Sequence, residues 1–195
     1  GEYDLAGFAV GVVEKSQIID GSKVKPGDVV LGLASSGPHS NGFSLIRKIV
    51  EVSGASWDMP FDGATLADRL MEPTRIYCKQ VANVMKKVPI HAMAHITGGG
   101  LVENVPRVLP EGTQVVIHRD SWKRPAIFDW LQKEGNVAED EMLRVFNNGI
   151  GLVVIVPAEA ADAAVSAFES EGEKVYRLGE VVNRANAADP GCVVI

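Results

Sequence analysis

The sequence predicts a single layered domain of the α/β or α+β class, built around a mixed sheet. Short apolar runs typical of buried strands alternate with helical patterns along the 195 residues, without long linkers, internal repeats or low-complexity tracts. Hydrophobic residues make up 46% of the chain and charged residues 23%. This balance is ordinary for a globular domain with its own core.

Each element is predicted from its hydrophobic pattern. Alternation or a continuous apolar run predicts strands at residues 5–13, 29–33, 91–96, 115–118, 150–156 and 175–182, with a strand-like run at 193–195. Helical periodicity predicts helices that begin near Phe43 and cover residues 74–87, 101–105 (stopped by Pro106), 125–134 (ended by Gly135), 139–144 and 157–171. Residues 53–64 are predicted to form a loop.

Composition and charge narrow the class of protein. The net charge is −6 and no cluster of Lys or Arg stands out, which argues against a nucleic-acid partner. No apolar run approaches the ~20 residues that cross a bilayer and no signal peptide is recognisable, so we expect a cytoplasmic protein without a membrane partner. Cys78 and Cys192 fit reduced thiols better than a disulfide framework or a zinc site. The absent initiator Met and the apolar final residues predict an excised domain.

The most informative segment is the loop Gly-Pro-His-Ser-Asn-Gly at residues 37–42, between a predicted strand and a predicted helix. Such a loop suits phosphate, because free backbone N–H groups and the helix dipole meet there. Ser40 or Asn41 is expected to cap the helix, and His39 to project near a bound anion. An ordinary capped turn with a solvated histidine is the alternative. The candidate residues are Ser36, Gly37, His39, Ser40, Asn41 and Gly42.

A second loop of the same kind follows His95, with the candidate residues Thr97, Gly98, Gly99 and Gly100. Consecutive glycines are costly to order, so this backbone is expected to lie against phosphate or, alternatively, to pack tightly against another chain or domain. Arg75, near a helix start, is a candidate anion partner or simply a surface charge. The turn at residues 146–151 could line a pocket, although a structural role is favoured.

Several motifs are missing from the sequence. It contains no P-loop, no dinucleotide-binding fingerprint and no nucleophile elbow. No tight carboxylate cluster suggests a Mg²⁺ site, so no metal ligand is assigned.

Four motifs together resemble the phosphoribosylformylglycinamidine cyclo-ligase (aminoimidazole ribonucleotide synthetase) family, in the family's order. They are residues 35–42, 72–77, 95–101 and 146–151. Residues 1–8 resemble the family's inter-domain junction. The resemblance covers essentially the whole chain.

The resemblance implies that residues 1–195 are the single C-terminal domain of a two-domain enzyme, with a mixed, largely antiparallel sheet flanked by helices. The family uses ATP to convert formylglycinamidine ribonucleotide to aminoimidazole ribonucleotide in purine biosynthesis, releasing ADP and phosphate. ATP is thought to activate the formyl oxygen before the amidine nitrogen attacks. ATP and Mg²⁺ are implied to bind mainly to an N-terminal domain absent from this chain. The fragment alone is therefore expected to be inactive, and the intact enzyme to be a homodimer.

By resemblance, the two loops hold the ribonucleotide phosphate. His39 is the candidate catalytic residue, by proton transfer or by electrostatic stabilisation. His95 is a candidate that acts through its neighbours rather than by direct contact with the substrate. Arg75 is a weaker candidate for contact with the anion. Related two-part enzymes are the first alternative: formylglycinamidine ribonucleotide synthetase, selenophosphate synthetase, thiamine phosphate kinase and a hydrogenase maturation factor. A non-catalytic phosphate-ligand sensor or assembly module is the second.

Overall fold

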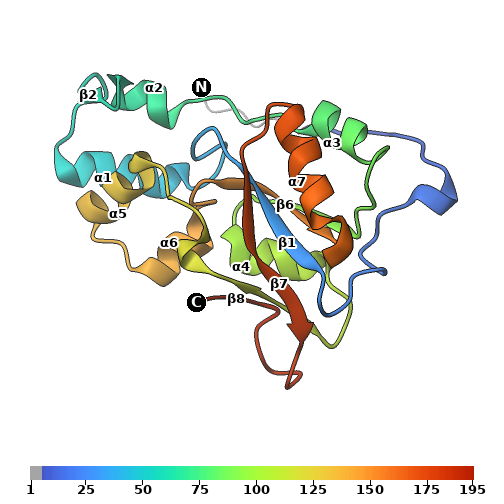
Figure 1. Cartoon of the computed structure of the whole chain (residues 1–195). Helices are drawn as coiled ribbons and strands as arrows, with labels where there is room; N and C mark the ends of the chain where they lie inside the picture. Colours follow the sequence, from blue (N-terminus) through green and yellow to red (C-terminus); the bar gives the residue numbers. More distant parts are fainter. Residues whose placement is uncertain (1–5) are drawn as a thin grey trace.

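Six strands form the central sheet, in the order β4-β6-β1-β7-β5-β8. The computed structural model describes residues 6–195 (Figure 1). The strands are β1 (Val29–Ala34), β4 (Ala92–His95), β5 (Thr113–Ile117), β6 (Ile150–Val156), β7 (Val175–Asn183) and β8 (Cys192–Val194). Neighbouring strands are antiparallel except β5 and β8, which are parallel. The predicted mixed, largely antiparallel sheet is confirmed.

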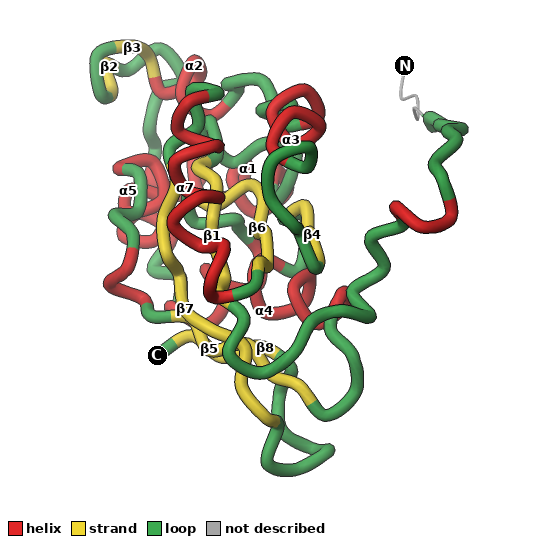
Figure 2. Tube along the Cα trace, turned by 45° about the vertical axis from the view of Figure 1, so that its right-hand side comes forward, coloured by secondary structure: helices red, strands yellow, loops and turns green. Residues whose placement is uncertain are grey.

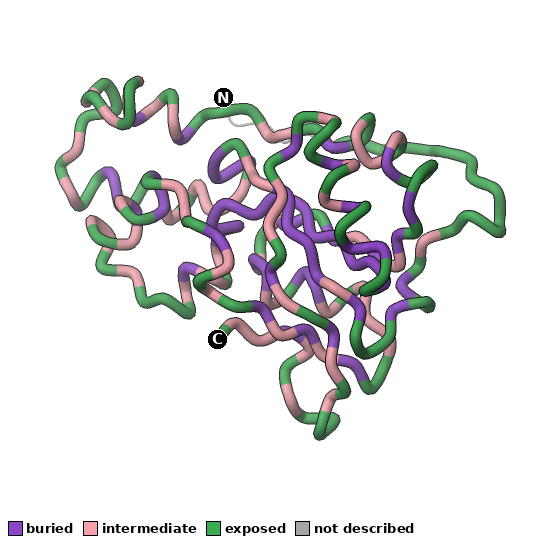
Figure 3. Tube along the Cα trace, in the orientation of Figure 1, coloured by how far each residue is buried: buried purple, intermediate pink, exposed green. Residues whose placement is uncertain are grey.

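Helices cover both faces of this sheet, which is why β1 and β6 are continuous apolar runs. One face packs on α4 (Gly100–Asn104) and the short 3₁₀ turn Val105–Val108. The other packs on α3 (Cys78–Val84) and α7 (Ala161–Ser170). Because side chains alternate along a strand, Val30 points to the first layer, whereas Leu31 points to the second. Figure 3 shows the buried sheet between these layers.

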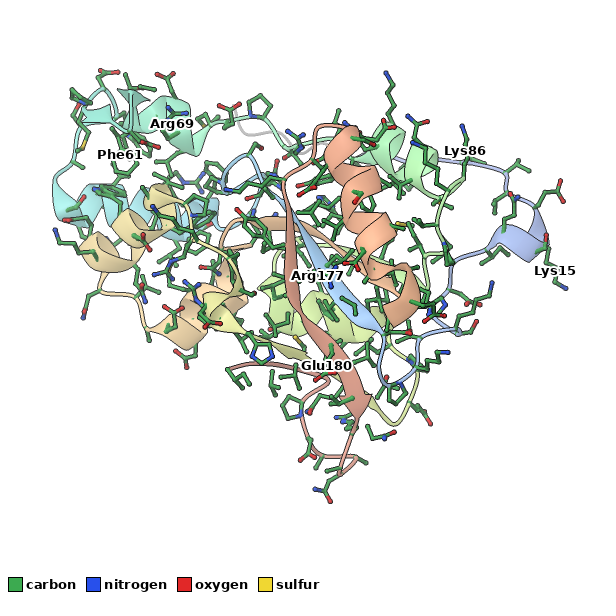
Figure 4. The ribbon with its side chains drawn as sticks, viewed as in Figure 1. Lys15, Phe61, Arg69, Lys86, Arg177 and Glu180 are labelled. Atoms are coloured by element: carbon green, nitrogen blue, oxygen red, sulfur yellow. The ribbon has the colours of Figure 1, made fainter. Side chains whose placement is uncertain are left out.

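A second, smaller core lies beside the end of the sheet. It is built by α1 (Phe43–Ser53), α2 (Leu66–Leu70), α5 (Ala126–Gly135) and α6 (Glu139–Val145). Ile46, Phe128 and Phe146 are fully buried there. A short hairpin, β2 (Pro60–Phe61) with β3 (Ala64–Thr65), precedes α2. Arg69 of α2, labelled in Figure 4 together with Phe61 of this hairpin, donates from Nε to the main-chain oxygen of Asp62 at 3.1 Å.

Some boundaries differ from the predictions. The helix predicted at 74–87 begins only at Cys78, because residues 72–77 run as an irregular segment against the loop after β1. Pro106 does not stop the preceding helix but continues it as a 3₁₀ turn. Asn136, with φ +45°, caps α5 in place of Gly135. The predicted loop at 53–64 contains β2, and the helix predicted from Pro157 opens with the 3₁₀ turn Ala158–Ala160.

The strand predicted at residues 5–13 is wrong for the residues that the structure describes. Residues 6–13 form no strand and are exposed along their whole length, and Leu5 lies outside the described part. The pattern of a strand is present, but no neighbouring strand pairs with it. Figure 2 shows this segment standing away from the sheet and helices.

The two cysteines differ in exposure. Cys78 is exposed and Cys192 buried, and both are free thiols. Across residues 6–195, each helix is too short or too polar to cross a bilayer.

Candidate functional site

The loop between β1 and α1 ends at an open helix N-terminus. Gly42 is the N-cap of α1 with φ +75°, and no side chain caps the helix. A Cβ at Gly42 would lie 2.3 Å from the Phe146 ring, so only glycine fits. The prediction that Ser40 or Asn41 caps the helix is therefore wrong. The first-turn N–H groups of an 11-residue helix are left without a side-chain acceptor.

Ser40 and Asn41 instead join this loop to other parts of the chain. The Ser40 hydroxyl lies 3.2 Å from the Thr74 hydroxyl. The Asn41 side-chain oxygen accepts the Gly98 N–H at 3.0 Å. The two glycine-rich loops that the sequence singled out are thus in direct contact.

Asn104 organises the second loop from α4. Its Nδ2 donates to the main-chain oxygens of Gly98 and Gly100, at 3.2 and 2.8 Å, and its Oδ1 accepts the Thr97 hydroxyl at 3.1 Å. The sequence analysis did not identify Asn104 as a site residue. Asparagine can satisfy several loop groups at once because it carries both donors and acceptors.

Packing within the chain explains why glycine is required at two of the three positions 98–100 of the second loop. A Cβ at Gly100 would lie 1.9 Å from the Leu143 main-chain oxygen, and one at Gly99 would lie 2.7 Å from the Glu103 carboxylate. Both have positive φ. A Cβ at Gly98 would meet nothing within 4 Å, so Gly98 is the glycine of this loop with open space beside it. The role of the three as phosphate ligands stays a prediction.

The motifs at residues 72–77 and 146–151 also form hydrogen bonds with the first loop. Buried Asn147 donates to the Gly37 main-chain oxygen at 2.9 Å and accepts the Ser35 hydroxyl at 3.0 Å. The Ser36 hydroxyl donates to the Pro73 main-chain oxygen at 2.7 Å. All four motifs, far apart in sequence, therefore meet at one place. The structural role favoured for the turn at residues 146–151 agrees with these contacts.

His39 is buried rather than solvated, with only 3% of its surface exposed. Its Nε2 accepts the main-chain N–H groups of Ser36, at 3.2 Å, and Arg75, at 3.4 Å. Burial, together with the nearby His95, lowers the pKa of His39 from 6.5 to about 4. Because Nε2 accepts two hydrogen bonds, the single proton of the neutral ring belongs on Nδ1. His39 thus holds the loop as a neutral ring, and its catalytic role stays a prediction.

His95 is the exposed histidine of the site. It ends β4, and its ring centre lies 6.2 Å from that of His39 and 6.4 Å from that of Tyr77. The Tyr77 hydroxyl donates to the Ala34 main-chain oxygen at 2.8 Å, and burial raises the pKa of this phenol. A Cβ at Gly151 would lie 2.0 Å from the Tyr77 hydroxyl and 2.6 Å from the His39 ring, so the ring cluster requires glycine there.

Arg75 is engaged within the chain. Its Nε and one terminal nitrogen bind the Glu173 carboxylate at 2.8 and 3.1 Å, and the Glu173 side chain is fully buried. This ion pair neutralises the positive charge of Arg75, which the sequence analysis considered as a contact for an anion. The interpretation of Arg75 as a plain surface charge is corrected, and its role as an anion contact stays a prediction.

A cleft of about 450 Å³ opens beside the first loop. Its lining includes five residues of the first two motifs: His39, Ser40, Glu72, Pro73 and Thr74. It also includes four residues that the sequence analysis did not identify as site residues: Phe43, Arg47, Trp57 and Met71. Phe43 and Arg47 are four residues apart on α1, so they lie on one side of the helix. Within residues 6–195, Arg47 forms none of the ion pairs with Asp or Glu, whereas Lys48 beside it pairs with Glu51 at 3.0 Å.

A smaller hollow of about 240 Å³ lies between the two loops, lined by Gly42 and Gly98 together with Glu103 and Arg144. Arg144 is bound by Glu141 at 2.8 Å, and Glu103 adds a further negative charge. Both places thus combine a cation with a carboxylate, Arg144 with Glu103 in the hollow and Arg47 with Glu72 in the cleft. Arg144 is already paired with Glu141, whereas Arg47 forms none of the ion pairs within residues 6–195, and this favours the cleft for an anion beside the first turn of α1.

Among residues 6–195, no three Asp, Glu, His or Cys side chains gather as a metal-binding group. The binding of Mg²⁺, which the resemblance places mainly in an N-terminal domain, stays a prediction.

The architecture defines an α/β fold that is shared by part of the chain in other solved structures. The structure matches a thiamine-monophosphate kinase from Stenotrophomonas maltophilia with a TM-score of 0.64 and 16% identity, over 93% of this chain and 54% of that chain. It matches the hydrogenase maturation protein HypE in complex with ATP with a TM-score of 0.60 and 23% identity, over 89% of this chain and 49% of that chain. At these identities, the likeness shows the fold alone.

The family follows from the sequence comparison. The model of the AIR synthase related protein C-terminal domain matches residues 25–188, and the chain belongs to this family. The phosphoribosylformylglycinamidine cyclo-ligase of Cupriavidus pinatubonensis is 57% identical over 194 residues, covering 100% of this chain and 55% of that protein. That of Cupriavidus taiwanensis is 58% identical over 185 residues, covering 95% and 53%. The chain thus spans about half the length of these curated relatives.

Proposed function

We propose that this chain is the C-terminal half of an ATP-dependent cyclo-ligase that converts formylglycinamidine ribonucleotide to aminoimidazole ribonucleotide, releasing ADP and phosphate. Family membership and relatives of that name, 57–58% identical, support the proposal. The intact protein is proposed to be a cytoplasmic homodimer whose N-terminal half binds most of the ATP and Mg²⁺. The other half then supplies the activating chemistry, and this half supplies the substrate site.

The observation that carries this role is the open N-terminus of α1 beside the Arg47 cleft. The N–H groups of the first turn and the helix dipole attract an anion, and Arg47, one turn further along, adds a full positive charge. Ser40 and Thr74 offer hydroxyl groups to the same cleft. This combination suits the phosphate of a ribonucleotide, which is larger and more highly charged than a single carboxylate.

The residues around this site have separate tasks in the proposal. His39 fixes the loop by accepting two main-chain N–H groups, and as a neutral ring it adds no charge that would compete with Arg47. His39 also borders the cleft, and the exposed ring of His95 lies next to it, with the two ring centres 6.2 Å apart. Gly98 leaves open backbone where the second loop meets Asn41. Holding the ribonucleotide here restricts its motion, which favours ring closure.

A full-length hybrid tests the proposal. This chain replaces the matching C-terminal segment of the Cupriavidus pinatubonensis enzyme, and ATP-dependent formation of aminoimidazole ribonucleotide is measured. We expect turnover in the hybrid, a loss of at least tenfold in Arg47→Gln, and little change in Lys48→Gln, which removes a charge from the same helix. A folded hybrid without turnover would contradict the proposed function.

A further inference from the structure

The position of the segment at residues 72–77 depends on side chains rather than on regular structure. Within residues 6–195, the main-chain groups of residues 72–76 form no hydrogen bond with another main-chain group. The segment nevertheless forms one wall of the cleft, through Glu72, Pro73 and Thr74. An irregular segment shifts easily unless other groups fix it, so the contacts that fix this segment also determine the shape of the wall.

The bonds between this segment and the first loop are exposed to water or long. The hydroxyls of Ser40 and Thr74, which lie 3.2 Å apart, are exposed. The Arg75 N–H donates to His39 Nε2 at 3.4 Å, which is longer than the usual range for a hydrogen bond. A small outward shift of Arg75 would therefore break its bond to His39.

A stronger contact comes from the turn between α7 and β7. Both oxygens of the Glu173 carboxylate bind the Arg75 guanidinium, at 2.8 and 3.1 Å, and the Glu173 side chain is fully buried. A pair of this kind fixes the direction of both groups, because the guanidinium and the carboxylate are planar and meet through two bonds. Breaking the pair would leave a buried charge without its partner, so Arg75 is firmly held.

The turn that carries Glu173 is itself fixed by the regular part of the fold. The Glu173 N–H donates to the Phe168 main-chain oxygen in α7 at 3.1 Å, and the Ala34 N–H of β1 donates to the Lys174 main-chain oxygen at 3.0 Å. Figure 1 shows this turn at the same end of the molecule as the segment between α2 and α3. The ion pair thus lets a rigid turn determine where Arg75 lies.

Arg75 connects this ion pair to the buried ring of His39. Its guanidinium binds Glu173, while its main-chain N–H is one of the two donors that bind His39 Nε2. These donors place the ring proton on Nδ1. Nδ1 is buried and has no hydrogen-bond partner among residues 6–195, so this tautomer is stabilised from the Nε2 side of the ring.

We propose that Glu173 is a positioning residue for the candidate site. By binding Arg75, it keeps the Arg75 N–H on His39 Nε2 and thereby fixes both the tautomer of His39 and the wall of the cleft that includes Thr74. Glu173 is not among the residues that line the cleft, so it acts through Arg75. The effect on the ribonucleotide rests on the proposed function, whereas the effect on the His39 ring does not.

The ring nitrogens of His39 test the proposal by ¹⁵N NMR at neutral pH, on the 195-residue chain without ligand. In the native chain, Nε2 should give the signal of an unprotonated nitrogen and Nδ1 that of a protonated one. In Glu173→Gln, which removes the charge at nearly the same volume, the two signals should move toward each other as both tautomers become populated. Glu171→Gln is the matched control and should leave both signals unchanged, because Glu171 lies near the same turn but binds Asn83 rather than Arg75.

A second variant and a kinetic measurement complete the test. Arg75→Lys keeps the opposite charges but loses the two-bond geometry, so it should move the same signals by a smaller amount, whether or not Glu173→Gln folds. In the full-length hybrid described above, Glu173→Gln should raise the KM for formylglycinamidine ribonucleotide by about fivefold or more and change kcat by less than about twofold, as expected when a binding wall is displaced. Glu171→Gln should change neither.

Two results would overturn the proposal. Native ring signals in folded Glu173→Gln, or in Arg75→Lys if the first variant does not fold, would leave the ion pair with a purely structural role. An unchanged KM in an active Glu173→Gln hybrid would show that the pair does not position the cleft wall. A hybrid that makes no product, together with ring signals that move as expected in the chain, would contradict only the proposed function.

Discussion

Protonation of His39 should make the stability of this chain depend on pH. The fold holds the ring neutral, with a pKa lowered from 6.5 to about 4 by burial and by His95. In the unfolded chain, His39 returns to its ordinary pKa and binds its proton first as the pH falls. The stabilisation is therefore complete above about pH 6.5 and is lost as the pH falls toward 4. At about 1.4 kcal/mol per pH unit, the loss amounts to about 3 kcal/mol.

The contacts of the ring explain this loss. Protonated Nε2 cannot accept the N–H groups of Ser36 and Arg75, so protonation both charges a buried ring and breaks two hydrogen bonds. Urea unfolding at pH 7 and at pH 4 measures the effect in the native chain and in His39→Gln, which keeps an acceptor but does not titrate. We expect the native chain to lose about 3 kcal/mol more than the variant over this interval.

Many other groups titrate in the same interval, so the difference between the two proteins carries the prediction. His118→Gln is the control, because His118 is exposed. It should follow the native chain at both pH values. If His39→Gln loses as much stability as the native chain, the account of a buried neutral His39 is refuted.

Two further predictions concern the packing of the site. Gly100→Ala should destabilise the chain by about 2 kcal/mol or more, because its Cβ would strike the Leu143 main-chain oxygen at a positive φ; Gly98→Ala, with open space around it, is the control, and equal urea midpoints would contradict the prediction. Arg75→Ala should cost about 2 kcal/mol, because buried Glu173 loses its partner. Lys87→Ala, which breaks an exposed 3.8 Å pair with Glu171, should cost no more than about 0.5 kcal/mol, and a similar cost for both would refute this reasoning.

The sheet was largely predictable because its strands carry their pattern locally. Strands β1 and β6 are apolar runs, whereas β7 mixes apolar with charged residues, and the structure places each within about two residues of its prediction. Residues 6–13 show the limit of this reasoning, because they carry the pattern of a strand but form none. Their alternation predicts a strand correctly only if a neighbouring strand exists, and no residue pattern within a segment reveals whether its partner belongs to the same chain.

The site was predictable in its loops but not in its side-chain roles. The glycines and polar residues marked both loops, and the resemblance grouped all four motifs. The inward turn of His39 depends on a positive φ of 58°, which is uncommon outside glycine and has no signal in the sequence. The role of Arg47 could not be predicted, because periodicity separates the polar from the apolar face of a helix but does not show which polar residue borders a cleft.

A calorimetric titration of this chain with formylglycinamidine ribonucleotide tests the central claim most directly, namely that the phosphate binds at the N-terminus of α1 beside Arg47. ATP is the comparator ligand. The account predicts binding of the ribonucleotide in preference to ATP, weakened about tenfold, or about 1.4 kcal/mol, by Arg47→Gln and left within about twofold by Lys48→Gln. Equal affinities in the native chain and Arg47→Gln, or preferential binding of ATP, would contradict it.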